Sequence, residues 1–214
     1  MRPASGLALW HLVTAVVTTA ALLLQTALVI NGAAVLNETD PPALATRLGR
    51  LVSYFTIQSN LLIAITASTL ALNPVRDGPF WRVFRLAGII GITVTGLVHF
   101  FLLRPLLDLE GLNWVADKSL HIVVPVLALA SWLAIGPRPR IDRRAMLGAL
   151  AWPIAWLVWT LTVGSLTGWY PYPFLNINKE GAAAVAGVSA AITLLFIVLI
   201  GAAYAVDRRL PARG

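Results

Sequence analysis

The chain has 214 residues, of which 58% are hydrophobic and only 12% charged, with a mean hydropathy of +0.81 and a net charge of +7. A soluble domain usually carries about a quarter charged residues, so this composition excludes a water-soluble globular fold. The chain has no cysteine, which excludes disulfides, thiolate nucleophiles and cysteine metal sites. Because the basic residues flank apolar runs, the positive charge indicates membrane lipids, and not nucleic acid, as the partner.

Six apolar segments are each long enough to cross a bilayer, which needs roughly 20 residues at 1.5 Å per residue. The pattern predicts transmembrane helices near residues 7–30, 51–72, 82–104, 119–136, 145–166 and 182–205. The first is too long for the core of a signal peptide, which spans about 7–15 residues, so we interpret it as a membrane span. No linker is long enough to separate domains. The sequence therefore predicts an all-α fold, a single six-helix transmembrane domain over residues 1–214.

Six spans place the connecting loops alternately on the two sides of the membrane. The basic residues are distributed unevenly between these two sides. Lys and Arg accumulate in cytoplasmic loops, and 11 of the 16 fall on one side. These are Arg2, Arg76, Arg82, Arg85, Arg138, Arg140, Arg143, Arg144, Arg208, Arg209 and Arg213. The sequence therefore predicts a multi-pass protein of the cell membrane with both termini in the cytoplasm.

Polar side chains gather in the outer half of three predicted helices, where such groups are energetically expensive and usually mark function. In the second helix Thr56, Ser59 and Asn60 share one face, because they stand at positions i, i+3 and i+4. His99 lies about five residues from the outer end of the third helix, and His121 lies near the outer start of the fourth. At about 1.5 Å per residue, the depths of the threonine and the two histidines agree within roughly 5 Å. The pattern predicts one polar layer built by three segments.

A threonine hydroxyl beside a neutral histidine is suited to attack on an ester carbonyl, with the histidine as general base. We therefore predict Thr56 as the nucleophile and His121 as the base of a candidate catalytic site. The candidate supporting residues are Gln58, Ser59, Asn60, His99 and Asp117. A side chain of residues 58–60 or a helix-terminal N–H is the expected donor to the oxyanion, although Gln58 points away from the face of Thr56.

Asp117 precedes His121 by four residues, so its carboxylate can reach an imidazole N–H and set the tautomer, as an orienting acid does in a catalytic triad. The other interpretation makes Asp117 the N-cap of the helix at 119–136. A structural interpretation of the whole cluster also stays open. Threonines in membranes often bond their own i−4 carbonyl, and histidines often make a single interhelical bond.

Two further features lie outside this cluster. The aromatic, proline-rich segment 169–174 fits either an interfacial belt or a loop that caps a cavity. His11 lies far from the other histidines in depth, and we interpret it as structural. We find no carboxylate–histidine constellation, no glycine-rich phosphate loop and no chain of acidic residues across the membrane, and therefore predict no metal and no cofactor.

Three short sequences resemble the bacterial Pr6Pr membrane proteins, which are similar to the androgen-induced-protein family of animals. They are residues 54–60 (YFTIQSN), 121–125 (HIVVP) and 169–175 (WYPYPFL). The resemblance spans nearly the whole chain and implies an intramembrane threonine hydrolase of fatty acid esters of hydroxy fatty acids. It assigns the threonine to Thr56 and the histidine to His121. The sequence departs from the animal members in two places. The segment from Thr56 to Asn60 is a residue longer than in those members, and Asp117 stands where they have Asn.

Two hypotheses from different classes follow from these patterns. In the first, the protein hydrolyses a long-chain acyl ester inside the membrane. In the second, it is a non-catalytic membrane module that binds lipid, transports a small molecule or packs with partner proteins, and the polar cluster only holds helices together. The distance between Thr56 and His121 distinguishes them, because only the first requires direct or one-water contact.

Overall fold

The structure is a computed structural model that describes residues 4–33 and 42–212. Two of the residues used to predict the orientation, Arg2 and Arg213, lie outside this part of the chain. The described residues form helices and loops, and they contain no strand. Six helices are long and apolar enough to cross a membrane, as the sequence predicts for an all-α fold of six spans.

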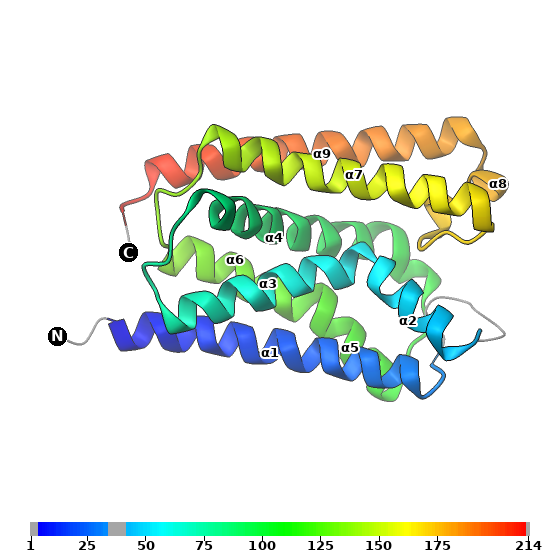
Figure 1. Cartoon of the computed structure of the whole chain (residues 1–214), viewed down its shortest axis with the longest axis horizontal. Coiled ribbons are helices and arrows are strands. Elements are labelled where there is room, and N and C mark those ends of the chain that lie inside the picture. The colour runs from blue at the N-terminus through cyan, green and yellow to red at the C-terminus, as the bar shows by residue number, and fades with distance from the viewer. Residues whose placement is uncertain (1–3, 34–41, 213–214) are drawn as a thin grey trace.

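The spans pack as a bundle with alternating directions (Figure 1). They are α1 (Ala4–Ile30), α3 (Phe55–Leu72), α4 (Pro79–Val98) continued to Leu106, a composite of α5 (Gly111–Lys118) and α6 (Val124–Ala130), α7 (Arg143–Thr167) and α9 (Ala182–Arg209). Two shorter helices, α2 (Leu44–Ser53) and α8 (Ile177–Glu180), lie at the end opposite the two termini. We call these two ends of the bundle the α2–α8 end and the terminal end.

Two helix starts differ from their predicted positions. The helix expected at 51–72 is broken at Tyr54, whose extended backbone (ψ 129°) separates α2 from α3. The helix expected at 119–136 begins earlier, at Gly111. The charged pair Asp117-Lys118, which suggested a helix start, instead lies within the helical span. Its two side chains form an ion pair at 2.9 Å.

The central helix of the bundle is α4, which is the most buried span and packs against α3, α6, α7 and α9. Glycines permit its close contacts. A Cβ atom on Gly88 would lie 3.2 Å from the side chain of Leu62 in α3, and one on Gly91 would lie 2.7 Å from the Trp152 ring in α7. Small residues at helix crossings are typical of membrane bundles. There, close packing between helix backbones, and not the hydrophobic effect, drives the association of helices.

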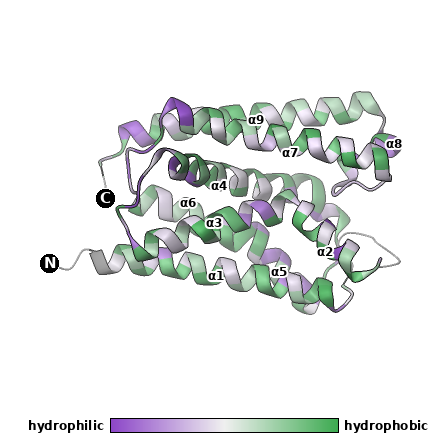
Figure 2. Ribbon diagram, in the orientation of Figure 1, coloured by the Kyte–Doolittle hydropathy of each residue, from purple (hydrophilic) through white to green (hydrophobic). Residues whose placement is uncertain are grey.

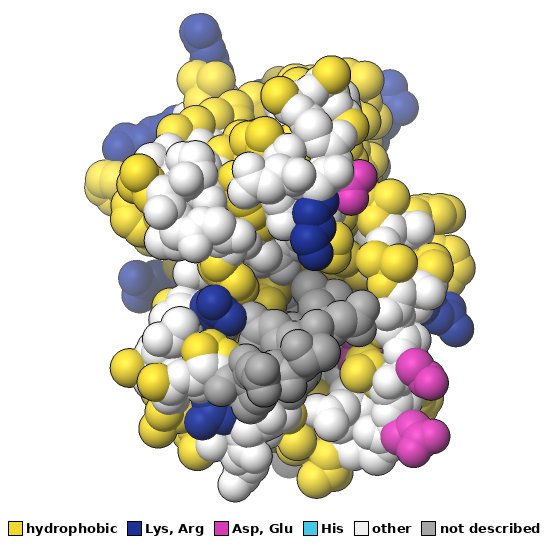
Figure 3. All heavy atoms as spheres, turned by 90° about the vertical axis from the view of Figure 1, so that its right-hand side faces the viewer, with side chains coloured by type: hydrophobic (Ala, Val, Ile, Leu, Met, Phe, Trp, Pro, Cys, Tyr) yellow, Lys and Arg dark blue, Asp and Glu magenta, His cyan; other side chains and the backbone are white. Residues whose placement is uncertain are grey.

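The outward faces of the bundle are apolar. Large side chains such as Leu23 and Leu166 are 65% and 81% exposed, and exposed apolar surface on this scale marks a lipid-facing surface. Hydrophobic residues run along the helices, whereas hydrophilic residues concentrate at the ends and, inside the bundle, on α3 and beside α5 (Figure 2). Basic and acidic side chains are exposed on the α2–α8 end (Figure 3).

Ion pairs hold the loops together at the terminal end. Arg82 lies 2.7 Å from Asp77 and 3.0 Å from Asp142, and so links the loop before α4 to the start of α7. The hydrogen bond from Arg82 lowers the pKa of Asp77 to about 2. Asp142 also caps α7, because its side chain accepts the backbone N–H of Ala145.

Candidate active site

Thr56 occupies the second position of α3, just after the break at Tyr54. The first N–H groups of a helix have no acceptor within the helix, so the break leaves the Thr56 N–H free for another partner. It donates to the phenol oxygen of Tyr172 at 3.2 Å. The kink thus places a buried hydroxyl and a backbone donor that binds the Tyr172 phenol on the same residue.

The two histidines of the predicted layer each lie in a π-helical turn, one at His99–Leu103 and the other at Ser119–Val123. In the second turn, Pro125 has no N–H to donate to the carbonyl of His121 four residues earlier, so the α-helical ladder cannot continue there. A π-helical turn inserts an extra residue and re-aims its side chains, and such turns are frequent at functional sites. Here the rings of His99 and His121 stack with centroids 3.9 Å apart and planes inclined by 12°.

The structure brings Thr56 and His121 into contact. Thr56 Oγ1 lies 3.3 Å from His121 Nε2. The other ring nitrogen, Nδ1, lies 3.0 Å from the backbone oxygen of Asp117 and 3.1 Å from its carboxylate. Because both of these partners accept hydrogen bonds, Nδ1 carries the ring proton of the neutral imidazole. Nε2 is then unprotonated and accepts from the Thr56 hydroxyl, which is the arrangement that a general base requires.

Asp117 lies between the two histidines and a lysine. One carboxylate oxygen is 2.8 Å from His99 Nε2 and 3.1 Å from His121 Nδ1, and the other is 2.9 Å from Lys118 Nζ. The interpretation of Asp117 as an N-cap is wrong, because α5 begins at Gly111 and Asp117 is its seventh residue. Its carboxylate instead orients the imidazole of His121 and is 7% exposed.

Tyr172 is the site residue that the sequence analysis did not name. Its phenol oxygen lies 3.3 Å from Thr56 Oγ1, in addition to accepting the Thr56 N–H. Burial raises the pKa of the Tyr172 phenol, so the group stays protonated and retains a proton to donate. The loop that carries it packs closely on α7, since a Cβ on Gly164 would lie only 2.1 Å from the Tyr170 ring. The sequence signals for this loop were the aromatic composition of residues 169–174 and the Pr6Pr resemblance of residues 169–175, and neither singled out Tyr172.

The remaining predicted residues of α3 do not reach the reacting groups. Ser59 donates to the Phe55 carbonyl at 2.8 Å, and the amide of Asn60 donates to the Thr56 carbonyl at 2.8 Å. Gln58 faces α7, where its side-chain oxygen accepts from Trp152 at 3.3 Å. The expectation that residues 58–60 provide an oxyanion donor is therefore not met by the geometry, and the Thr56 N–H and the Tyr172 hydroxyl lie nearest to the nucleophile.

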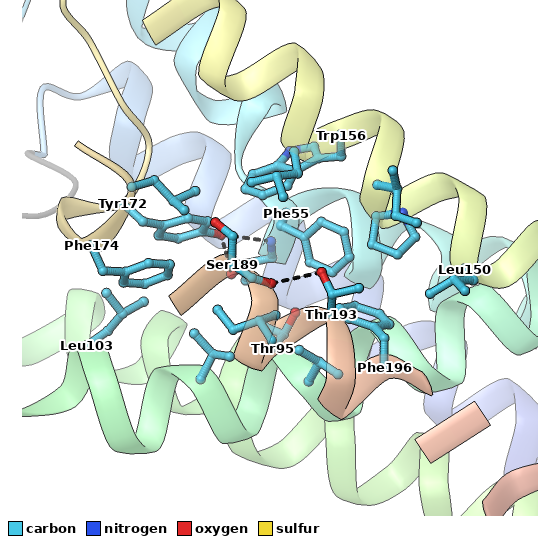
Figure 4. Close-up of a pocket in the computed structure, with 18 residues that line it drawn as sticks. Phe55, Thr95, Leu103, Leu150, Trp156, Tyr172, Phe174, Ser189, Thr193 and Phe196 are labelled. Atoms are coloured by element: carbon cyan, nitrogen blue, oxygen red, sulfur yellow. Dashed lines mark hydrogen bonds between the residues drawn. The ribbon is translucent and has the colours of Figure 1, made fainter. Parts of the chain in front are cut away.

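Two cavities meet at Thr56 and Tyr172, which line both. The first, which we call the apolar cavity, lies between α3, α4, α7 and α9 and encloses about 670 Å³, including the part that opens to the outside. Tyr172 and Phe174 lie at one end of it and Leu150 at the other (Figure 4). The second, the polar cavity, encloses about 660 Å³ on the same basis. Its polar lining residues are Gln25, Thr56, His99, Asn113, Asp117, His121 and Tyr172.

His99, Asp117 and His121 also form a group that could ligate a metal, with donor atoms within 4.8 Å of one another. The expectation that the chain holds no carboxylate–histidine constellation is therefore wrong. The geometry fits hydrogen bonding better than metal binding. The two rings are nearly parallel, so their lone pairs do not converge on one point, and Lys118 already provides a positive charge to the carboxylate.

Comparisons with protein-family models, with curated proteins and with solved structures found no match. The fold and the site therefore define the class by themselves. The described chain is an all-helical bundle with six helices suited to crossing a membrane, and it carries a buried Thr–His–Asp chain at the meeting point of two cavities.

Proposed function

We propose that the protein is an intramembrane hydrolase of long-chain acyl esters, with Thr56 as nucleophile, His121 as general base and Asp117 as the residue that orients the base. The observation that carries the proposal is the contact between Thr56 Oγ1 and His121 Nε2 at 3.3 Å. The Pr6Pr resemblance independently implies the same pair and the same chemistry. We also propose that the protein spans the cell membrane with both termini in the cytoplasm, which places the site in the outer leaflet.

The chemistry follows from the positions of these groups. The Thr56 oxygen attacks the ester carbonyl while His121 Nε2 takes its proton. The oxyanion that forms accepts a hydrogen bond from the Tyr172 hydroxyl, whose oxygen is held in place by the Thr56 N–H. The bond to the leaving alcohol then breaks, and His121 returns the proton to that alcohol. Water, activated by the same histidine, cleaves the acyl-threonine to a carboxylic acid and the free residue.

The two cavities support an ester whose halves lie on opposite sides of the nucleophile. The apolar cavity is lined mainly by aliphatic and aromatic side chains such as Phe55, Trp156 and Phe196, and it suits an acyl chain. The polar cavity holds the histidines and Gln25, and it suits the alcohol half of the ester and the incoming water. The substrate class that the resemblance implies, fatty acid esters of hydroxy fatty acids, has two such halves.

The experiment that tests the proposal is hydrolysis of fluorogenic esters of graded acyl length by the purified, detergent-solubilised protein. Turnover that depends on chain length is the expected result. A wild type that is folded but inactive at every chain length would instead favour the non-catalytic lipid-binding or transport module.

Removing metal ions is expected to leave this activity unchanged. The nearly parallel imidazoles and the lysine beside Asp117 indicate that the carboxylate acts through hydrogen bonds. The measurement is the turnover rate after dialysis against EDTA and after addition of Zn²⁺. A loss on dialysis that Zn²⁺ restores would show that His99, Asp117 and His121 form a metal centre.

Replacing Tyr172 by Phe is expected to lower kcat by about tenfold to a hundredfold with little change in KM. The substitution keeps the ring in its aromatic contacts but removes a donor to the developing oxyanion, and single oxyanion donors contribute on this scale or more. Tyr204→Phe, in the half-buried part of α9, is the matched control. Equal rates for the wild type and Tyr172→Phe would exclude the phenol from this role.

A further inference from the structure

Another cavity lies near the terminal end of the bundle, remote from Thr56. It is formed by α1, α3, α4 and α6 with the π-helical turn Ser131–Ile135, and it encloses about 250 Å³, including its open part. Its polar lining residues are His11, Thr14, Thr66, Arg85 and Ser131. Thr66 is ten residues beyond Thr56, so the two sites are separated by about 15 Å along α3. We call this space the Arg85 cavity.

Arg85 is a buried cation with incomplete compensation. Its side chain is 7% exposed and donates to the carbonyl of Gly136. Its guanidinium lies over the Trp81 ring, 5.4 Å from the centroid. Its Nε has no hydrogen-bond partner, and within the described part of the chain no carboxylate lies within 4.0 Å of it. Asp207 attracts Arg85 from a greater distance, while Arg138 and Arg140 repel it. A charge inside a membrane span is expensive unless it is paired, and it is usually functional.

Asp207 is already engaged by other groups. One of its oxygens accepts the backbone N–H of Arg140 at 2.8 Å and that of Ile141 at 2.9 Å. Arg140 itself pairs with Asp77 at 3.4 Å. The carboxylate therefore organises the loop before α7 and does not form an ion pair with Arg85, so no anionic group contacts the guanidinium directly within the described part of the chain.

Two hydroxyls of the cavity have their protons engaged, so the further donor to a bound ion has to come from His11. Thr14 and Thr66 donate their hydroxyl protons to carbonyls of their own helices, Thr14 to Trp10 at 3.0 Å and Thr66 to Leu62 at 2.7 Å. The imidazole of His11 is buried, and its Nδ1 lies 2.9 Å from the Ser131 hydroxyl. When Ser131 donates to Nδ1, the ring proton of His11 lies on Nε2.

We propose that the Arg85 cavity binds a compact monovalent anion, of which chloride is the natural probe. The guanidinium supplies the charge and the His11 Nε2–H supplies a second donor. The volume suits a single small ion and not a lipid headgroup with its glycerol. The anion neutralises Arg85 and fixes α1 against α4 and the turn at Ser131, in a role independent of ester hydrolysis.

The test is ³⁵Cl NMR line broadening with the full-length protein in detergent, titrated from low to high chloride at constant ionic strength with gluconate. We expect saturable broadening that bromide displaces and inorganic phosphate does not. Arg85→Gln is expected to abolish the saturable part. Arg143→Gln, which removes an exposed arginine on the same end, is expected to keep it.

Broadening that rises linearly without saturation, or that is the same in Arg85→Gln as in the wild type, would overturn the proposal and leave water as the occupant. Displacement by phosphate would contradict a halide-sized site. If Arg85→Gln does not fold, Ser131→Val provides a second variant that retains the cation, removes the partner of His11 and narrows the cavity. A chloride affinity at least about tenfold weaker is expected for it, and an unchanged affinity would equally refute the proposal.

Discussion

Replacing Thr56 by Ala is expected to lower kcat for ester hydrolysis by at least about 10³-fold, since the variant lacks the oxygen that forms the acyl intermediate. The fold should survive, because among the described residues the Thr56 hydroxyl forms hydrogen bonds only with His121 and Tyr172. The start of α3 depends on the Thr56 backbone and not on its side chain. Thr56→Ser keeps the hydroxyl and should retain activity within about tenfold of the wild type. The measurement is steady-state turnover of the best fluorogenic ester.

Thr93→Ala is the matched control for this variant. Thr93 is a half-buried threonine in α4 whose hydroxyl bonds the Ile89 carbonyl at 2.7 Å, so its loss tests the general cost of removing a hydroxyl from the bundle. Wild-type turnover in Thr93→Ala together with none in Thr56→Ala would assign the effect to the site. Activity retained by Thr56→Ala would refute the nucleophile and favour the non-catalytic module.

Replacing Asp117 by Asn is expected to reduce kcat by about 10²- to 10³-fold while KM changes little. The carboxylate stabilises the imidazolium that forms when His121 takes the threonine proton, an interaction that is present only in the transition state. The backbone oxygen of Asp117 still holds Nδ1 at 3.0 Å in the variant, which keeps the tautomer and limits the loss. Steady-state kinetics over a range of substrate concentrations separates kcat from KM.

Asp108→Asn is the matched control, because Asp108 is exposed at the same end of the bundle. Its turnover should equal that of the wild type. An Asp117→Asn protein with normal kcat, or one that loses only folding stability, would show that the carboxylate serves the packing of α5 and not the base.

Residue spacing and the alternation of span directions were sufficient to predict that Thr56, His99 and His121 lie at a similar depth, but not that they meet. Whether these side chains point toward one another depends on local backbone features that residue spacing does not reveal. The extended residue Tyr54 restarts the helix just before Thr56. The π-helical turn next to Pro125 re-aims His121. Helical periodicity assumes that neither interruption exists.

The missed residues have equally specific causes. Tyr172 belongs to a loop that follows α7 and returns to the start of α3, and a contact over 116 positions has no signature in local pattern. Asp117 was predicted either to orient His121 or to cap the helix, and the sequence does not distinguish the two roles. In the structure its charge is compensated by Lys118 and two imidazoles, which a hydropathy profile cannot represent.

The central claim is that Thr56 is a nucleophile, and the most direct measurement is covalent labelling with a long-chain alkyl fluorophosphonate followed by mass spectrometric mapping of the modified residue. The account predicts a single adduct on Thr56, absent from Thr56→Ala and formed far more slowly in His121→Ala. An adduct on another residue, or a folded wild-type protein that is neither labelled nor able to hydrolyse any ester tested, would contradict it.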